Sequence, residues 1–547
     1  MARERYVIGG VSRLTVRVAR LLTARGAEVV VAADGDDHDL AGLLGPEVRV
    51  VTAIERAEAL RLAGLANAEC LLALADDDLD NVRTAAAAGA VAPDVPLVVR
   101  SFDPVLGDQL EQSGGVRRAY SVSDLAAPVF VARALGDDVV ETFRLGDAEV
   151  LLCRVTVRSG SPLVGMTARE LKREFGCAVV AGNDVGVLER SIVEGDQILV
   201  GAPLLHVLRL VLRNSRPGPR LRAPRASIVS GPSASPRATL LPAAVVALFA
   251  VLTLATIVFA LERDIGLVES IYFAFTIAWG NAGLTGTPAW LQLFGVAFML
   301  AVGALVGVLF SHLASVATAE RLDARTGRRA RRLSGHVVVA GLGTVGYRIE
   351  RLLHQLGLEA AVLEREPATR FVDAAREHAP VLAGDVRLPE NLERVGIANA
   401  ACLMAVTDED LANITACLHA RRINPGIRTV ARIFDDTLGE RIGGTLNIDA
   451  TISASRVAAS AFVAAAVDDW ARRPFVVGDR PYLALRLECR RPIAFDEIER
   501  WRSDGLRVLA VRHGHGEVQP PSDLLAGLAV GDSAIIAGPE AVVAAIV

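Results

Sequence analysis

The segment His336-Val-Val-Val-Ala-Gly-Leu-Gly-Thr-Val-Gly346 joins an apolar strand to a glycine turn and the start of a helix. Leu352 and Leu353 continue that helix on one face, and Glu359-Ala-Ala-Val-Leu-Glu364 is typical of a second buried strand. Strands that alternate with helices of this length predict a parallel, doubly wound α/β sheet.

The glycine turn in this segment also predicts a ligand site. Gly341, Gly343 and Gly346 permit a tight turn, and the N-terminus of the following helix offers free N–H groups to a pyrophosphate. Glu364 follows about 20 residues later, where an acid can bind ribose hydroxyls. We therefore expect NAD or an adenine nucleotide here. The alternative is a purely structural glycine turn.

The pattern occurs twice in the chain. Leu65–Asn81 matches Ile397–Asn413, and Val99-Arg-Ser-Phe-Asp103 matches Ala431-Arg-Ile-Phe-Asp435 at the same offset. Agreement over so many positions indicates a duplicated domain. A smaller α+β lobe follows each copy, ending in similar strands after Gly195-Asp196 and Gly531-Asp532.

The first copy has lost the features that predict nucleotide binding. It carries Gly10, Ser12 and Thr15 at the places of the three glycines, and Ala33 at the place of Glu364. We expect this copy to bind nucleotide weakly or not at all. Its acidic run Asp76–Asp78 has no spacing suited to coordination, so a solvated loop is favoured over a cation site.

An apolar stretch separates the two copies. Ala238–Leu261 contains no charge, and Ser270–Ala319 contains only His312 and Tyr272 as ionisable residues. A bilayer core requires about 20 apolar residues in a helix, so this stretch predicts two spans. Arginines flank the pair of spans on both sides, which places both termini in the cytoplasm and the chain in the plasma membrane.

Composition excludes several other classes. The chain has 547 residues and a net charge of −5, which gives no electrostatic basis for nucleic-acid binding. Its six cysteines form no Cys-x-x-Cys pair, so neither a zinc site nor a disulfide framework is predicted. The N-terminus lacks the apolar run of a signal peptide. We assign no catalytic residue and no metal ligand.

The paired units resemble RCK domains (regulators of potassium conductance) of Trk and Ktr uptake systems and of ligand-gated potassium channels. The resemblance covers 1–213 and 335–547 and implies Rossmann-like lobes, a homotetramer with a cytoplasmic ring of eight RCK domains, and a nucleotide in the second copy. By this analogy Asp385 lies near the adenine, whereas Asp408 and Asn413 are equally explained as capping and turn residues. The implied ligand contacts are Gly341, Leu342, Gly343, Thr344, Val345, Gly346, Glu364, Arg365, Asp385, Thr407, Asp408 and Arg432.

The polar loop between the spans predicts an ion pore. Thr276–Gly280 aligns by residue type with a potassium-channel filter but leaves a short preceding helix; Gly280–Thr285 leaves a longer one and is similar to the Asn-Ala-Gly loops of Trk and Ktr. We favour the second register, with Gly283 in the left-handed conformation that points carbonyls at the ion. A non-conducting anchor with a re-entrant turn is the alternative. The predicted filter is Gly280, Asn281, Ala282, Gly283, Leu284 and Thr285.

Two glycines in the second span, Gly303 and Gly307, are candidates for a gate, although their spacing favours close helix packing. The predicted organisation is an N-terminal Rossmann-like lobe (1–140), its C-lobe (141–213), a linker (214–238), the first span (239–262), the pore helix and filter (263–289), the second span (290–318), an arginine-rich linker (319–334), the second Rossmann-like lobe (335–472) and its C-lobe (473–547).

The sequence therefore predicts a tetrameric cation channel, for potassium, gated by NAD(H), ATP or ADP in the second RCK domain. Its partners would be copies of itself, membrane lipid and monovalent cations. Two alternatives stay open: a non-conducting nucleotide sensor that regulates a separate transporter, and a membrane-tethered NAD-dependent oxidoreductase, for which no proton-transfer constellation is found.

Overall fold

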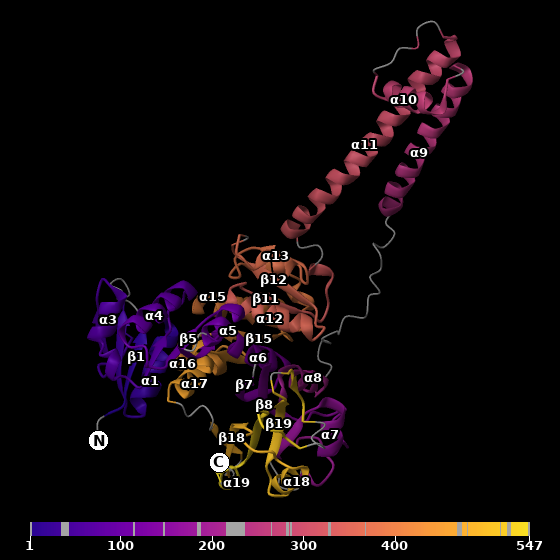
Figure 1. The fold of residues 1–547 in the computed structure, drawn as a ribbon. Helices are drawn as coiled ribbons and strands as arrows, with labels where there is room; N and C mark the ends of the chain where they lie inside the picture. Colours follow the sequence, from indigo (N-terminus) through magenta and orange to yellow (C-terminus); the bar gives the residue numbers. More distant parts are fainter. Residues whose placement is uncertain are drawn as a thin grey trace. The chain divides into compact units, whose positions relative to one another are not determined.

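The computed structural model divides into two units that are described separately, one of 1–223 with 329–547 and one of Pro224–Arg328. The residues that it describes are 3–33, 43–112, 115–145, 148–182, 188–214, 236–263, 265–280, 284, 287–326, 330–366, 368–467, 473–477, 480–514, 516–521 and 527–544. Figure 1 shows the helices and strands along the chain.

The first copy of the duplicated domain is a six-stranded parallel sheet in the order β3-β2-β1-β4-β5-β6. Its central strands are buried on both faces, which explains their continuous runs of Val, Leu and Ala. Its elements are β1 (Arg5–Gly9), α1 (Arg13–Ala24), β2 (Glu28–Ala33), β3 (Arg49–Thr52), α3 (Arg56–Leu62), β4 (Cys70–Ala73), α4 (Asp78–Val91), β5 (Leu97–Arg100), α5 (Pro104–Gln112), β6 (Val116–Tyr120) and α6 (Val122–Leu135).

The second copy repeats this topology in the order β13-β12-β11-β14-β15-β16, again all parallel. The predicted doubly wound α/β fold is therefore confirmed for both copies. Its elements are β11 (Val337–Ala340), α12 (Thr344–Gln355), β12 (Ala360–Glu364), α13 (Val372–Arg376), β13 (Val381–Ala383), α14 (Pro389–Arg394), β14 (Cys402–Ala405), α15 (Asp410–Ile423), β15 (Arg428–Arg432), α16 (Asp436–Thr445), β16 (Ala450–Ile452) and α17 (Ala454–Ala466).

The two copies exchange their last helices. Helix α6 of the first copy packs against α12 of the second, and α17 of the second packs against α1 of the first (Figure 1). Phe130 of α6 shares a core with Ile349 of α12, and Phe462 of α17 shares a core with Leu14 of α1. Because each copy buries apolar surface contributed by the other, neither has a complete core of its own.

The two smaller lobes also pack on each other. Their antiparallel sheets are ordered β7-β8-β10-β9 and β17-β18-β21-β19-β20, and a shared core joins Leu199 to Leu509 and Ile535. Gly201 lies where an added Cβ would come within 2.7 Å of Leu509 Cδ1. The elements are β7 (Asp138–Leu145), β8 (Ala148–Thr156), α7 (Ala168–Phe175), β9 (Ala178–Gly182), β10 (Gln197–Pro203), α8 (Leu204–Asn214), β17 (Arg473–Val477), β18 (Arg480–Glu488), α18 (Phe495–Ser503), β19 (Arg507–Arg512), β20 (Val518–Gln519), β21 (Ser533–Pro539) and α19 (Glu540–Ala544).

The other unit consists of α9 (Pro236–Arg263), α10 (Leu267–Ala278) and α11 (Ala289–Thr326). Phe259 is fully buried at its centre, where its ring meets those of Phe273, Phe294 and Phe298 edge-on. Ala244–Arg263 and Ala289–Ser311 are long and apolar enough to cross a membrane. Large apolar side chains on both helices are exposed, so this unit carries an extended apolar surface.

Candidate functional site

The glycine turn of the second copy has a separate steric reason for each glycine. Gly341 has φ +102°, and a Cβ there would lie 2.9 Å from the amide nitrogen of Thr407. A Cβ on Gly346 would lie 2.0 Å from the carbonyl oxygen of Gly341. Gly343 differs, because no atom of the described residues lies within 4 Å of its added Cβ. Two of the glycines therefore close the turn, and the third leaves open space in front of it.

The N-terminus of α12 faces that open space without a cap. Gly343 is its N-cap residue, and no side chain caps the first turn. Glu364 at the end of β12 lies beside it: its carboxylate accepts a hydrogen bond from the backbone N–H of Leu342, and another from Glu366 at 2.9 Å. The N–H groups of a helix N-terminus can bind a phosphate, and a carboxylate fixed beside them can accept hydrogen bonds from ribose hydroxyls.

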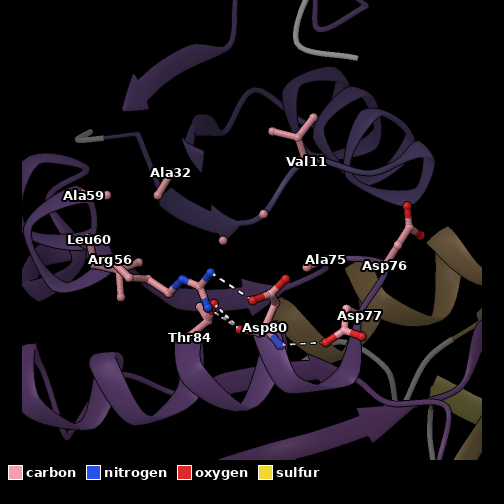
Figure 2. A pocket seen from close by; sticks show the side chains of 12 residues that line it. Val11, Ala32, Arg56, Ala59, Leu60, Ala75, Asp76, Asp77, Asp80 and Thr84 are labelled. Atoms are coloured by element: carbon pink, nitrogen blue, oxygen red, sulfur yellow. Dashed lines mark hydrogen bonds and ion pairs between the residues drawn. The ribbon is translucent and has the colours of Figure 1, made fainter. Parts of the chain in front are cut away.

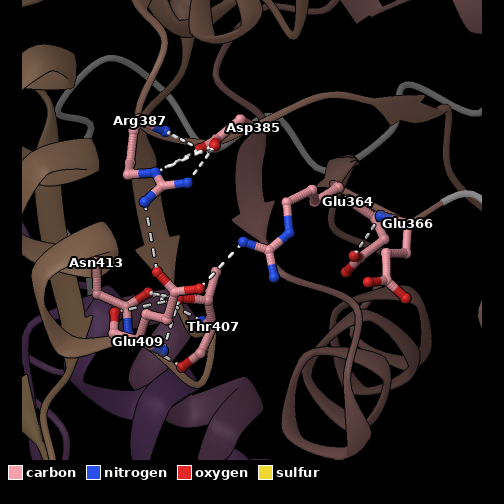
Figure 3. Close-up of polar contacts among 8 residues, drawn as sticks. Glu364, Glu366, Asp385, Arg387, Thr407, Glu409 and Asn413 are labelled. Carbon is pink, nitrogen blue, oxygen red and sulfur yellow. Dashed lines mark hydrogen bonds and ion pairs between the residues drawn. The ribbon is translucent and has the colours of Figure 1, made fainter.

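Charged side chains form a chain of ion pairs along the carboxyl ends of the neighbouring strands (Figure 3). Arg365 pairs with Glu409 at 3.0 Å, Glu409 with Arg387 at 3.5 Å, and Arg387 with Asp385 at 2.6 Å. The hydrogen bonds from Arg387 hold the pKa of Asp385 below its ordinary value. Asp385, which is predicted to lie near an adenine, is therefore ionised and paired with Arg387.

Sequence reasoning did not select Glu409 and Arg387. The available signal was their position, because they follow strand ends β14 and β13 within a few residues, as Thr407 and Asp385 do. Residues at the carboxyl ends of parallel strands converge on one edge of the sheet, where α/β proteins bind ligands.

Asn413 holds the loop between β14 and α15 in place. Its side chain accepts from the amide of Thr407 at 2.9 Å and from the hydroxyl of Thr407 at 2.7 Å, and it donates to the carbonyls of Thr407 and Arg432. Asn81 makes the matching backbone bonds to Ala75 and Arg100 in the first copy. Asn413 therefore acts as a turn residue in this structure, and Asp408 beside it is exposed.

The first copy fills its equivalent turn with its own hydroxyl groups. Ser12 is fully buried; its hydroxyl donates to the carbonyl of Leu74 at 2.6 Å and caps α1 by accepting from the amide of Thr15. The hydroxyl of Thr15 donates to the carbonyl of Gly10 at 2.9 Å. An internal cap thus occupies a backbone N–H that a phosphate would otherwise use.

A pocket of about 270 Å³ nevertheless lies in this first cleft (Figure 2). Its acidic residues have structural partners: Asp80 pairs with Arg56 at 3.3 Å, Asp76 pairs with Arg100, and Asp77 caps α4. Among the described residues, no group of three His, Cys, Asp or Glu side chains is arranged to hold a metal ion.

The predicted filter lies largely outside the described residues, which include Gly280 and Leu284 but not Asn281, Ala282, Gly283 or Thr285. Helix α10 ends at Ala278, and Gly280 after it has φ +73°. Within the described part of the chain, a Cβ added on Gly303 or Gly307 would meet no atom within 4 Å.

The TrkA-N domain model matches residues 6–122 and 337–454. A Trk system potassium uptake protein TrkA homolog of Pyrococcus horikoshii is 35% identical over 102 residues, which is 18% of this chain and 44% of that protein. A putative K(+) efflux antiporter KefB of Alkalimonas amylolytica is 32% identical over 106 residues, 19% of this chain and 16% of that protein. The chain thus spans less than half the length of either relative.

Solved structures share the fold over almost the whole chain. The GsuK channel bound to NAD covers 99% of this chain and 78% of its own, at 15% identity and a TM-score of 0.50. The chain therefore contains two TrkA-N domains, and it shares the fold of the GsuK channel. Both sequence relatives are potassium transport proteins by name.

Proposed function

We propose that four copies of this chain form a cation channel for potassium in the plasma membrane, with both termini in the cytoplasm. NAD(H), ATP or ADP, bound in the second RCK domain, would set its open probability. The single observation that carries the proposal is the open, uncapped Gly343 turn beside Glu364, on the same chain as two helices long enough to span a membrane.

The contrast between the copies supports the second one as the nucleotide site. Gly343 leaves space for a phosphate at α12, whereas Ser12 caps α1 from the equivalent position. Glu364 lies beside the turn where a ribose would lie, and Ala33 replaces it in the first copy. The chain therefore keeps one site suited to a nucleotide, and the first copy contributes mainly to packing.

The end of α10 supports the filter register that starts at Gly280. Thr276, Ile277 and Ala278 are helical, so they do not supply the extended carbonyl rings that the other register requires. Gly280 leaves the helix in a left-handed conformation. One pair of spans with one loop does not enclose a pore alone, so four copies are required.

Chain connectivity supports coupling through the second copy. Only three residues, 327–329, separate the end of α11 from the next element at Ala330, whereas 21 residues, 215–235, separate α8 from α9. The longer segment is rich in Pro, Arg and Ser and has the composition of a flexible linker. A short connection transmits a displacement better than a long flexible one.

Flux measurements test the proposal directly. Purified protein in liposomes is supplied with rubidium or sodium, and uptake is compared with NAD, NADH, ATP, ADP and no ligand. We expect rubidium uptake that depends on one of these nucleotides in the wild type and is insensitive to all of them in Gly343→Asp. This variant is preferred because its side chain enters open space rather than the closed turn.

Two outcomes would replace the proposal. Nucleotide binding without flux under any condition would favour a non-conducting sensor that regulates a separate transporter. Consumption of NADH with a substrate would favour a membrane-tethered oxidoreductase. Ion conduction requires flux through the purified protein. Gating also requires that the nucleotide bind one state of the ring more tightly than the other.

A further inference from the structure

A small pocket lies between the two Rossmann-like copies, within the same structural unit. Three arginines from different elements line it: Arg13 starts α1, Arg100 ends β5 and Arg432 ends β15. Asp76 is the only carboxylate among its lining residues. The pocket has a volume of about 50 Å³, which suits one small ion or a single group of a larger ligand.

The charges in this pocket are not balanced. Arg100 pairs with Asp76, which accounts for the one carboxylate. The guanidinium of Arg13 lies 4.9 Å from the ring centroid of Phe434, and it forms no ion pair with a carboxylate in the described part of the chain. Among the described residues, no carboxylate lies within 4 Å of the Arg432 guanidinium. Burial lowers the pKa of Arg432, and the nearby charges of Arg13 and Arg100 lower it further, against the opposing effect of Asp408 and Asp410.

The two copies carry the same two residue types here but pair them differently. Asp408 and Arg432 stand where the first copy has Asp76 and Arg100, which form an ion pair. Asp408 is instead exposed, and Arg432 turns into the pocket. Partly buried cations of like sign are costly unless an anion compensates them. Planar guanidinium groups that converge from several directions are the preferred partners of phosphate oxygens.

We propose that this pocket between the copies binds one phosphate-type oxyanion, held by Arg13 and Arg432 with Arg100 at its edge. The site is separate from the Gly343 turn and does not rest on the proposed function. The ligand group comes from one of two sources: free inorganic phosphate, or a phosphoryl group of a nucleotide that reaches the pocket. Because residues of both copies line the pocket, an anion there would bridge them and stabilise one arrangement.

Equilibrium dialysis of the full-length protein with radiolabelled inorganic phosphate tests the site, at constant ionic strength set with chloride. We expect one phosphate per chain in the wild type, displaced by sulfate. Loss of a charge-assisted contact is expected to weaken binding by about tenfold or more in Arg432→Gln and in Arg13→Gln. Arg376→Gln removes the same charge from an exposed pair with Asp373 and is expected to bind like the wild type.

Gly343→Asp and ADP separate the two sources. If phosphate is the ligand, Gly343→Asp binds it as the wild type does, and ADP does not displace it. If the pocket receives a nucleotide phosphoryl group, ADP displaces phosphate from the wild type but not from Gly343→Asp. Either result supports an oxyanion bound by Arg13 and Arg432, and the two results differ only in its source.

The proposal is overturned if the wild type binds no phosphate beyond that retained by Arg13→Gln and Arg432→Gln. It is also overturned if Arg376→Gln weakens binding as much as they do. Both pocket variants are expected to fold, because glutamine removes a partly buried charge and keeps the backbone carbonyl of residue 432 that Asn413 binds. Gel filtration and thermal unfolding of each variant without phosphate verify this.

Discussion

At the scale of single residues, two glycines of the α12 turn, Gly343 and Gly346, lead to opposite predictions for the same substitution. A methyl group at Gly346 would lie 2.0 Å from the Gly341 carbonyl oxygen, whereas a methyl group at Gly343 would meet no atom of the described residues within 4 Å. Gly346→Ala is therefore expected to destabilise the fold by about 1–3 kcal/mol, the cost of overpacking. Gly343→Ala is expected to leave the unfolding temperature unchanged and to weaken nucleotide binding. Thermal unfolding and titration calorimetry measure the two effects, and equal destabilisation by both would contradict the steric assignment.

Asn413 supports a second prediction at this scale. Its fully buried amide satisfies the Thr407 amide, the Thr407 carbonyl and the Arg432 carbonyl. Asn413→Ala leaves these groups without their partner, and each buried unsatisfied group costs about 1–3 kcal/mol. We expect a loss of stability in denaturant unfolding, and a similar loss for Asn81→Ala, because Asn81 makes the matching bonds. If only one of the two variants lost stability, the hydrogen bonds of Asn413 and Asn81 would not be equivalent.

Such residues mark the limit of prediction from the sequence. The glycine spacing was enough to predict the turn at Gly341–Gly346, because backbone sterics act locally. The same reasoning leaves Asn413 unassigned between a turn residue and a ligand contact, since its hydrogen bonds to residues 407 and 432 depend on how the strand ends are placed in the fold. Arg432, which stays a predicted nucleotide contact, also lines the pocket between the copies, and the sequence pattern does not indicate that position. Side-chain direction depends on packing that periodicity does not encode.

At the scale of elements, helix α12, which packs against α6, contains a buried ionisable group that gives the fold a pH dependence. Glu350 of α12 is 1% exposed, and burial raises its pKa from 4.5 to about 7, against a smaller lowering by Arg351. The folded state therefore binds a proton more tightly than the unfolded state between these values. Its stability falls as the pH rises from about 4.5 to 7, and the full penalty is present above pH 7.

Glu350→Gln should remove this part of the pH dependence, because the amide stays neutral. We expect the drop in unfolding temperature between pH 5 and pH 8 to be smaller in the variant than in the wild type. Asp137, whose pKa burial raises to about 6, contributes with the same sign to both proteins and cancels in the comparison. Glu377→Gln, at an exposed position, is the matched control. An unchanged profile for Glu350→Gln would place the ionised carboxylate in contact with solvent.

The helices around this contact also show what the sequence left out. Periodicity predicted the strands and helices of both copies, and the offset between the copies predicted that they fold alike. It did not predict that α6 and α17 exchange partners, because each helix has an apolar surface that would suit either copy. The exchange depends on which copy offers the complementary surface, and that is a property of the assembled unit.

At the scale of the whole molecule, the proposed gating depends on the connection between α11 and the second RCK domain. Movement of the domain reaches α11 through residues 327–329 if this connection is stiff enough to transmit it. A six-residue Gly-Ser insertion there adds slack without changing the nucleotide site. The same insertion within 215–235 lengthens a segment that already has the composition of a flexible linker, so it serves as the control.

The insertion after residue 327 should leave nucleotide affinity and basal rubidium flux unchanged, while the ratio of flux with and without nucleotide falls toward one. The insertion within 215–235 should keep the wild-type ratio. The opposite pattern, with loss of the response only for the 215–235 insertion, would assign coupling to the first copy. Titration calorimetry on the same preparations separates uncoupling from lost binding, because a binding event can shift the pore only through the difference in its affinity for the two states.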